Sequence, residues 1–172
     1  MEKREDFEKL AAFIERHKLS RITFYALKPV RGTPYDHGPS TIDYAWWIAR
    51  TRIRFPALQI IAGTAAARVD EVDILLRAGA NAITKFPATK MFGTEKARLI
   101  EIKAASAGRD WVSNLHKLPD IDWDSQIDAL DISEELKEKT KLKMRSYLEM
   151  MRNAHEKHDA DVKHAVDIGL EE

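Results

Sequence analysis

The chain of 172 residues contains no cysteine. Without a thiol it cannot form a disulfide framework, a thiol nucleophile, a zinc ribbon or an iron–sulfur cluster held by its own thiolates. It also lacks an excess of either charge, with 28 basic and 28 acidic residues. We therefore do not expect nucleic acid as a partner. No run approaches the roughly 18 apolar residues of a membrane span, and residues 1–7 lack the apolar core of a signal peptide. We expect a cytoplasmic protein with no membrane partner.

Several motifs of known enzyme classes are absent as well. The chain has no P-loop and no Gly-x-Gly-x-x-Gly, which bind phosphates, and no Gly-x-Ser-x-Gly turn for a hydrolase serine. A group of histidines and aspartates near the C-terminus has the spacing of a helical metal site, but a solvated terminus is the simpler interpretation, and we expect no metal site. Its members are His155, His158, Asp159, Asp161 and His164.

Three short apolar runs alternate with helical patterns, which is typical of βαβ units in a parallel sheet. The expected strands are 21–27, 58–62 and 81–85. The expected helices are 3–18, one capped by Ser40, one from about Arg68, and 94–105. Prolines and glycines predict an irregular loop over 28–39. In the second helix we expect a buried face of Ile42, Ala45, Trp46, Ala49 and Ile53.

The pattern changes after residue 108. Apolar residues lie there among many aspartates with no clear period, which predicts a meandering segment, and Ser133 then caps a long helix. Residues 119–172 carry 15 acidic and 8 basic side chains, so the rest of the chain is basic. We expect a βα domain over 1–118 and an acidic, mainly helical extension over 119–172.

Three parallel strands leave two open sheet edges, and parallel sheets are normally covered on both faces. A helix can cover apolar surface, but it cannot pair with a strand edge. Three solutions stay open: another chain supplies strands, the protein self-associates, or the C-terminal extension contains an unrecognised edge strand.

Four features between residues 21 and 115 occur in the same order as in the C-terminal part of biotin-synthase-like radical S-adenosylmethionine (SAM) enzymes. They are the Val-Arg-Gly-Thr-Pro loop 30–34, the arginine-rich helix end 50–56, the Ala-Gly pair 62–63 and the Ala-Gly-Ala-Asn turn 78–81. The chain resembles this family over a little more than half of its length. The resemblance implies a partial (β/α)8 TIM-type barrel over 1–118, made of the last three βα units and followed by the helical tail.

In that family the N-terminal part carries Cys-x3-Cys-x2-Cys, the ligands of the [4Fe–4S] cluster, and this chain lacks it. The resemblance therefore implies one segment of a split enzyme, which contributes part of the SAM and small-molecule substrate pocket. The cluster would lie on a partner chain, and this chain alone would not be catalytically competent. Two alternatives remain: a non-catalytic half-barrel interaction protein derived from the family, and a phosphate-handling barrel fragment supported only by Gly63 and Thr64.

Barrel active sites lie at the carboxyl ends of the strands. The resemblance thus implies SAM-binding positions at Tyr25, Ala26, Leu27, Lys28, Ala62, Gly63 and Thr64. It implies substrate-binding positions at Gln59 and Lys85. Lys28 and Lys85 could neutralise a carboxylate of SAM or of an anionic substrate, although surface lysines at loop starts are the plainer interpretation.

Gln59 stands where biotin synthase itself has an arginine that contacts its sulfur-donating cluster. Glutamine is a poor substitute there, which favours a relative with other chemistry. Lipoate-type sulfur insertion, methylornithine-type rearrangement and a further reaction all stay open. The backbone N–H groups of Gly63 and Thr64 could bind an oxygen anion, and a tight turn is the equal alternative.

Overall fold

The computed structural model describes residues 3–112 and 114–169, with side chains up to residue 154. The chain forms two compact units. The first runs through Phe86 and includes Ile102–Asp110, and the second contains Pro87–Glu101 and the residues from Trp111 onward. Each unit is described by itself.

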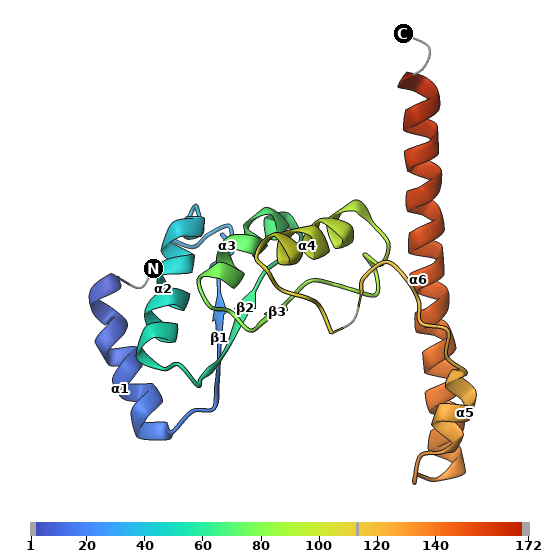
Figure 1. Ribbon diagram of the computed structural model, residues 1–172, viewed down its shortest axis with the longest axis horizontal. Coiled ribbons are helices and arrows are strands. Elements are labelled where there is room, and N and C mark those ends of the chain that lie inside the picture. Colours follow the sequence, from blue (N-terminus) through green and yellow to red (C-terminus); the bar gives the residue numbers. More distant parts are fainter. Residues whose placement is uncertain (1–2, 113, 170–172) are drawn as a thin grey trace. The chain divides into compact units, whose positions relative to one another are not determined.

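The first unit alternates helices with strands, as the sequence predicts. Its elements are η1 (Arg4–Asp6), α1 (Phe7–His17), β1 (Arg21–Tyr25), α2 (Thr41–Arg54), β2 (Gln59–Gly63), η2 (Ala66–Glu71), α3 (Val72–Arg77) and β3 (Ala82–Thr84). The strands form one parallel sheet in the order β1-β2-β3 (Figure 1). Arg21 lies opposite Gln59 and Tyr25 opposite Gly63, so β1 ends where its neighbour ends, two residues earlier than predicted.

The expectation of a partial (β/α)8 barrel is wrong. Among the residues with a described backbone there are three strands, which form one small open sheet with β1 and β3 as its outer edges. Closing a barrel requires strands that keep a steady tilt and stagger around a ring. Strands of three to five residues, with a single neighbour on each side of β2, do not form such a ring. The helical tail that was expected after the βα units is present.

One face of the sheet forms the core. Ile60 and Ala62 on β2 are fully buried, and α2 contacts both β2 and α3. Gln59 and Ile61 point to the opposite face and are only half-buried, as the two-residue period of a strand requires. The largest fully buried side chains each stabilise the fold by about 1.5–3 kcal/mol through burial. In this unit they include Ile48, Ile60, Val72 and Leu75.

The predicted buried face of α2 is largely wrong. Ile42 and Ile53 are 65% and 71% exposed, whereas Tyr44, Ile48 and Thr51 are buried. The helix is turned so that the Tyr44 hydroxyl donates to the Phe24 carbonyl on β1 at 2.7 Å. A buried hydroxyl needs such a partner, and this requirement decides the helix orientation that hydrophobic spacing left ambiguous. Of the predicted face, Ala45 is buried, and Trp46 and Ala49 are half-buried.

Both tryptophans of α2 pack against the first helix. The Phe7 ring lies 5.9 Å from Trp46 and 6.1 Å from Trp47 between ring centroids. Because both are half-buried and contact the same ring, they join α1 to α2.

Arg52, near the end of α2, holds the turn between α3 and β3. Its Nε and Nη2 donate to the Gly79 carbonyl at 3.1 and 3.0 Å, and its Nη1 donates to the Pro56 carbonyl at 2.7 Å. Nη2 also donates to the Asn81 side-chain oxygen, which accepts from the Ile60 N–H at 2.8 Å. Gly79 has φ +112°, and a Cβ there would press on the Arg52 side chain. Two motifs of the resemblance therefore meet in one structural junction.

The second unit contains most of α4 (Glu95–Ser106), then α5 (Trp123–Asp128) and α6 (Glu134–Gly169). The segment before α5 has no regular structure in its described part, as predicted. Glu101 holds it, because its carboxylate accepts from the Leu115 N–H and lies 2.6 Å from His116 Nδ1. None of the helices described has an apolar stretch of the length that a bilayer crossing requires.

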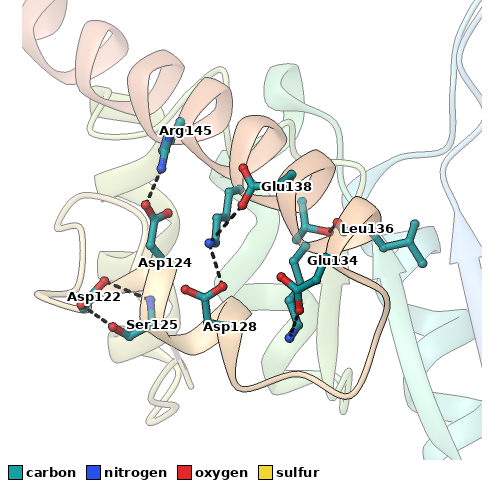
Figure 2. Close-up of polar contacts among 11 residues, drawn as sticks. Asp122, Asp124, Ser125, Asp128, Glu134, Leu136, Glu138 and Arg145 are labelled. Atoms are coloured by element: carbon teal, nitrogen blue, oxygen red, sulfur yellow. Dashed lines mark hydrogen bonds and ion pairs between the residues drawn. The ribbon is translucent and has the colours of Figure 1, made fainter.

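Helix α5 lies along the start of α6 as a helical hairpin (Figure 2). Lys141 is 2.7 Å from Asp128 and 3.2 Å from Glu138, and Arg145 pairs with Asp124. The hydrogen bond to Asp128 raises the pKa of Lys141. Ile127 is buried beneath these pairs. Because the carboxylates of these pairs are exposed, the pairs specify the register of the hairpin and contribute little stability individually.

Replacing Arg52 by lysine tests the junction. Arg52→Lys should destabilise the chain by about 2 kcal/mol, because a lysine cannot make the forked set of hydrogen bonds to three acceptors. Arg54→Lys is the matched control, since Arg54 is exposed and pairs only with Glu15; it should change stability by less than about 0.5 kcal/mol. Urea unfolding followed by circular dichroism measures both. Equally small losses of stability in the two variants would contradict the stabilising role of Arg52 at this junction.

Candidate functional site

The carboxyl ends of the strands bring three predicted site residues together. Tyr25 ends β1 opposite Gly63, and its ring lies over this glycine so closely that a Cβ at position 63 would overlap the ring. The Lys85 ammonium lies 4.1 Å from the centroid of the same ring. We call Tyr25, Gly63 and Lys85 the Lys85 shelf. Carboxyl ends of parallel strands are where α/β proteins commonly bind ligands.

Lys85 adopts an unusual backbone conformation. Its φ is +67°, and among the described non-glycine residues only Lys18 shares a positive φ. Lys18 ends α1, where a left-handed residue is common because it lets the N–H groups of the helix end reach earlier carbonyls. Lys85 follows a strand and has no such role. A left-handed lysine costs about 1 kcal/mol relative to glycine, and such strain is often found at functional sites.

The residues of β2 beyond the shelf have different roles. Ala62 is fully buried on the face that packs against helices, so its side chain does not reach the open face. The Thr64 N–H donates to the Thr84 carbonyl at 2.9 Å, and this N–H is therefore not available to an oxygen anion. The Thr64 hydroxyl is buried with no hydrogen-bond partner among the described atoms. This arrangement removes one of the two donors on which the phosphate interpretation depended.

The remaining SAM-binding candidates of the first strand lie at the start of the loop that follows β1. Ala26 is half-buried, while Leu27 and Lys28 are exposed. The loop closes on itself, because Gly38 lies so close to the Leu27 carbonyl that a Cβ would collide with it. Thr33 makes a turn by donating its N–H and hydroxyl to the Val30 carbonyl at 3.1 and 2.7 Å. The Gly-Thr-Pro motif thus forms a defined turn.

Gln59 lies at the other end of the sheet. It begins β2, and its side-chain oxygen accepts from Arg21 Nε at 2.6 Å. Four residues of strand separate it from Gly63, which is roughly 13 Å. The structure therefore does not bring the two predicted substrate-binding residues, Gln59 and Lys85, into one site.

A buried polar cluster supports the carboxyl ends of the strands, and sequence reasoning missed it. Glu71 is 5% exposed and accepts from Arg68 Nε and Nη2 at 2.8 and 2.6 Å, and from the Thr41 hydroxyl at 3.1 Å. Arg68 Nη1 also donates to the Pro39 carbonyl at 3.1 Å. The i, i+3 spacing of Arg68 and Glu71 was the signal that could have revealed the pair. The two charges of the cluster pair with each other, and the bond to the Pro39 carbonyl positions the end of the 28–39 loop.

Tyr44 completes this support. Its hydroxyl donates to the Phe24 carbonyl and lies 3.5 Å from the Gly63 carbonyl, at the ends of β1 and β2. Burial raises the pKa of Tyr44 to about 12. The hydroxyl is therefore a neutral hydrogen-bond donor at neutral pH and holds the strand ends in register.

No group of three metal-ligating side chains lies within the part of the chain whose side chains are described. The histidine and aspartate group from His155 to His164 falls outside that part, so its expected solvation stays a prediction. The carboxyl ends of the strands thus present the exposed Lys85 ammonium over the exposed Tyr25 ring.

Comparison with known proteins gives one relative and no family. No family model matches the chain, and no solved structure matches it. The chain is 37% identical over 163 residues to a protein of Methanocaldococcus jannaschii that is described as uncharacterized. The match covers 86% of this chain and 46% of that protein, so the chain spans about half the length of its relative. No solved fold supports the barrel expectation, in agreement with the open sheet.

Alkaline titration tests the Tyr44 contact. Since its pKa is raised from 10.0 to about 12, the stability it contributes is present below pH 10 and is lost as the pH rises from 10 to 12. The loss should total about 3 kcal/mol. Tyr44→Phe should remove this pH dependence and lower stability at pH 7 by about 1 kcal/mol. Tyr147→Phe, on the exposed side of α6, should keep it. Denaturant midpoints across this pH range measure the effect, and an identical decline in Tyr44→Phe would disprove the assignment.

Proposed function

We propose that the chain is the C-terminal segment of a split, biotin-synthase-like radical SAM enzyme of the cytoplasm. It contributes part of the SAM and substrate pocket, and a partner chain with Cys-x3-Cys-x2-Cys carries the [4Fe–4S] cluster. The observation that carries the proposal is the Lys85 shelf, which lies at the carboxyl ends of strands whose other face alone is packed. The four motifs shared with this enzyme family, in the same order, support it.

The incomplete sheet supports the need for a partner. Apart from the buried Gly63, the residues of the open face are half-buried or exposed, although parallel sheets are normally covered on both faces. They are Arg21, Thr23, Tyr25, Gln59, Ile61, Ala82 and Thr84. In the archaeal relative, more than half of the length lies outside the match, which leaves room for a part that would cover this face.

The residues of the shelf fit a SAM molecule, although the chain has no ligand for the cluster. The Tyr25 ring is 54% exposed and offers a face for stacking. Gly63, without a side chain, lets the Tyr25 ring lie flat over the end of β2. SAM bound there would supply hydrogen-atom abstraction from the substrate, once one electron from the partner's cluster has cleaved it. This chain's residues would position the substrate and exclude water from it.

The open strand edges favour a second candidate. A non-catalytic interaction protein derived from the same family would use the outer edges of β1 and β3 to pair with another strand, as exposed edges readily do. Such a protein would bind its partner with no turnover of SAM. Both candidates therefore bind a partner, and only the split enzyme would form a product from SAM.

Co-expression with a cluster-bearing chain from the same genome tests the proposed function. The two chains should purify together, and the reduced complex should convert SAM to 5′-deoxyadenosine. Tyr25→Leu should lower the rate about tenfold, because a stacking contact contributes on the order of 1 kcal/mol or more. Tyr35→Leu, an exposed tyrosine in the 28–39 loop, should leave the rate unchanged. A stable complex without 5′-deoxyadenosine would favour the interaction protein, and no complex with any such chain would refute the split enzyme.

A further inference from the structure

We propose that the Lys85 shelf binds the carboxylate group of a ligand that lies at the carboxyl ends of the strands. This rests on the proposed function for the identity of the ligand, but the shelf is built by this chain's own residues. The Lys85 ammonium has no carboxylate within ion-pair distance among the described residues, and it lies over the Tyr25 ring. A cation–π contact at an exposed site is weaker than a charge-assisted hydrogen bond. The ammonium therefore keeps donors for a stronger acceptor.

The local backbone is strained around this one side chain. Glycine at position 85 would relieve the positive φ, and a lysine is present instead. Position 63, by contrast, requires glycine, because any larger residue would displace the Tyr25 ring on which the ammonium rests. The ring thus holds the ammonium above the open face and reduces the conformational freedom that is lost on binding.

The number of available donors favours a carboxylate over a phosphate. Phosphate sites usually combine several backbone N–H groups or cations. Here the Thr64 N–H is bonded to the Thr84 carbonyl, and Lys28 has no described contact with the shelf. A single ammonium neutralises a singly charged carboxylate but leaves a phosphate dianion underpaired.

Nuclear magnetic resonance of the full chain tests the shelf. The Tyr25 ring and Lys85 side-chain signals are followed during titration with propionate and, separately, with uncharged propionamide, at constant ionic strength. Propionate should shift these signals and propionamide should not. Lys85→Gly should weaken propionate binding at least fivefold, which is about 1 kcal/mol. Lys18→Gly is the matched control, because it relieves the same backbone strain at the end of α1 and should bind propionate normally.

Both glycine variants should also raise the melting temperature by about 2–4 °C, since each replaces a left-handed lysine. This stability readout shows that Lys85→Gly folds, and Lys85→Gln, which keeps a side chain there, provides a second variant that should lose propionate binding. Propionate binding that persists in both Lys85 variants, or equal shifts with propionamide, would overturn the proposal.

Two nucleosides identify the source of the carboxylate. S-adenosylhomocysteine carries the amino-acid carboxylate of SAM, and 5′-methylthioadenosine lacks it. Tighter binding of the former that disappears in Lys85→Gly would assign the shelf to SAM, and equal binding together with a propionate effect would assign it to the substrate. The propionate result does not depend on SAM cleavage by a complex, so failure of the shelf and failure of the proposed function are distinguishable.

Discussion

The first unit depends on the pairing of β2 with a neighbour on each side and on the burial of one face of this short parallel sheet. Ile60 and Ala62 are completely buried on that face. The opposite face and the outer edges of β1 and β3 have no comparable cover among the described residues. In a parallel sheet, apolar side chains on each face are normally covered by packed elements, and backbone groups at each edge need hydrogen-bond partners. The open face is therefore the constraint from which the functional proposals follow.

Two polar assemblies hold the sheet at its ends. Arg52 ties α2 to the turn before β3, and the cluster of Arg68 and Glu71, with Tyr44 beside it, ties the helices to the carboxyl ends of β1 and β2. Both use charged or hydroxyl groups whose hydrogen bonds hold neighbouring elements together, so they provide rigidity. Lys85 differs from them because its ammonium lies over a ring, and among the described residues no carboxylate lies within ion-pair distance of it.

Periodicity predicted the order of the elements, because short apolar runs and helical spacing mark strands and helices in turn. It failed for α2, where the hydrogen-bonding need of the Tyr44 hydroxyl and the packing of both tryptophans on Phe7 decided the buried face. The barrel was inferred from motifs whose observed role is local, as Arg52 and Gly79 show. Of the candidate site, Tyr25, Gly63 and Lys85 were found from their positions at strand ends. The separation of Gln59 follows from the strand register, which no motif specifies.

Amide hydrogen exchange across the sheet tests the central claim most directly. In the isolated chain, the amides of β1 and β3 that do not pair with β2 should exchange fast, while those of β2 should be protected. Addition of a cluster-bearing partner should protect the outer amides of at least one edge strand and the amides near Lys85. Outer amides that are already as protected as those of β2 in the isolated chain would contradict the account, since the sheet would then need no partner.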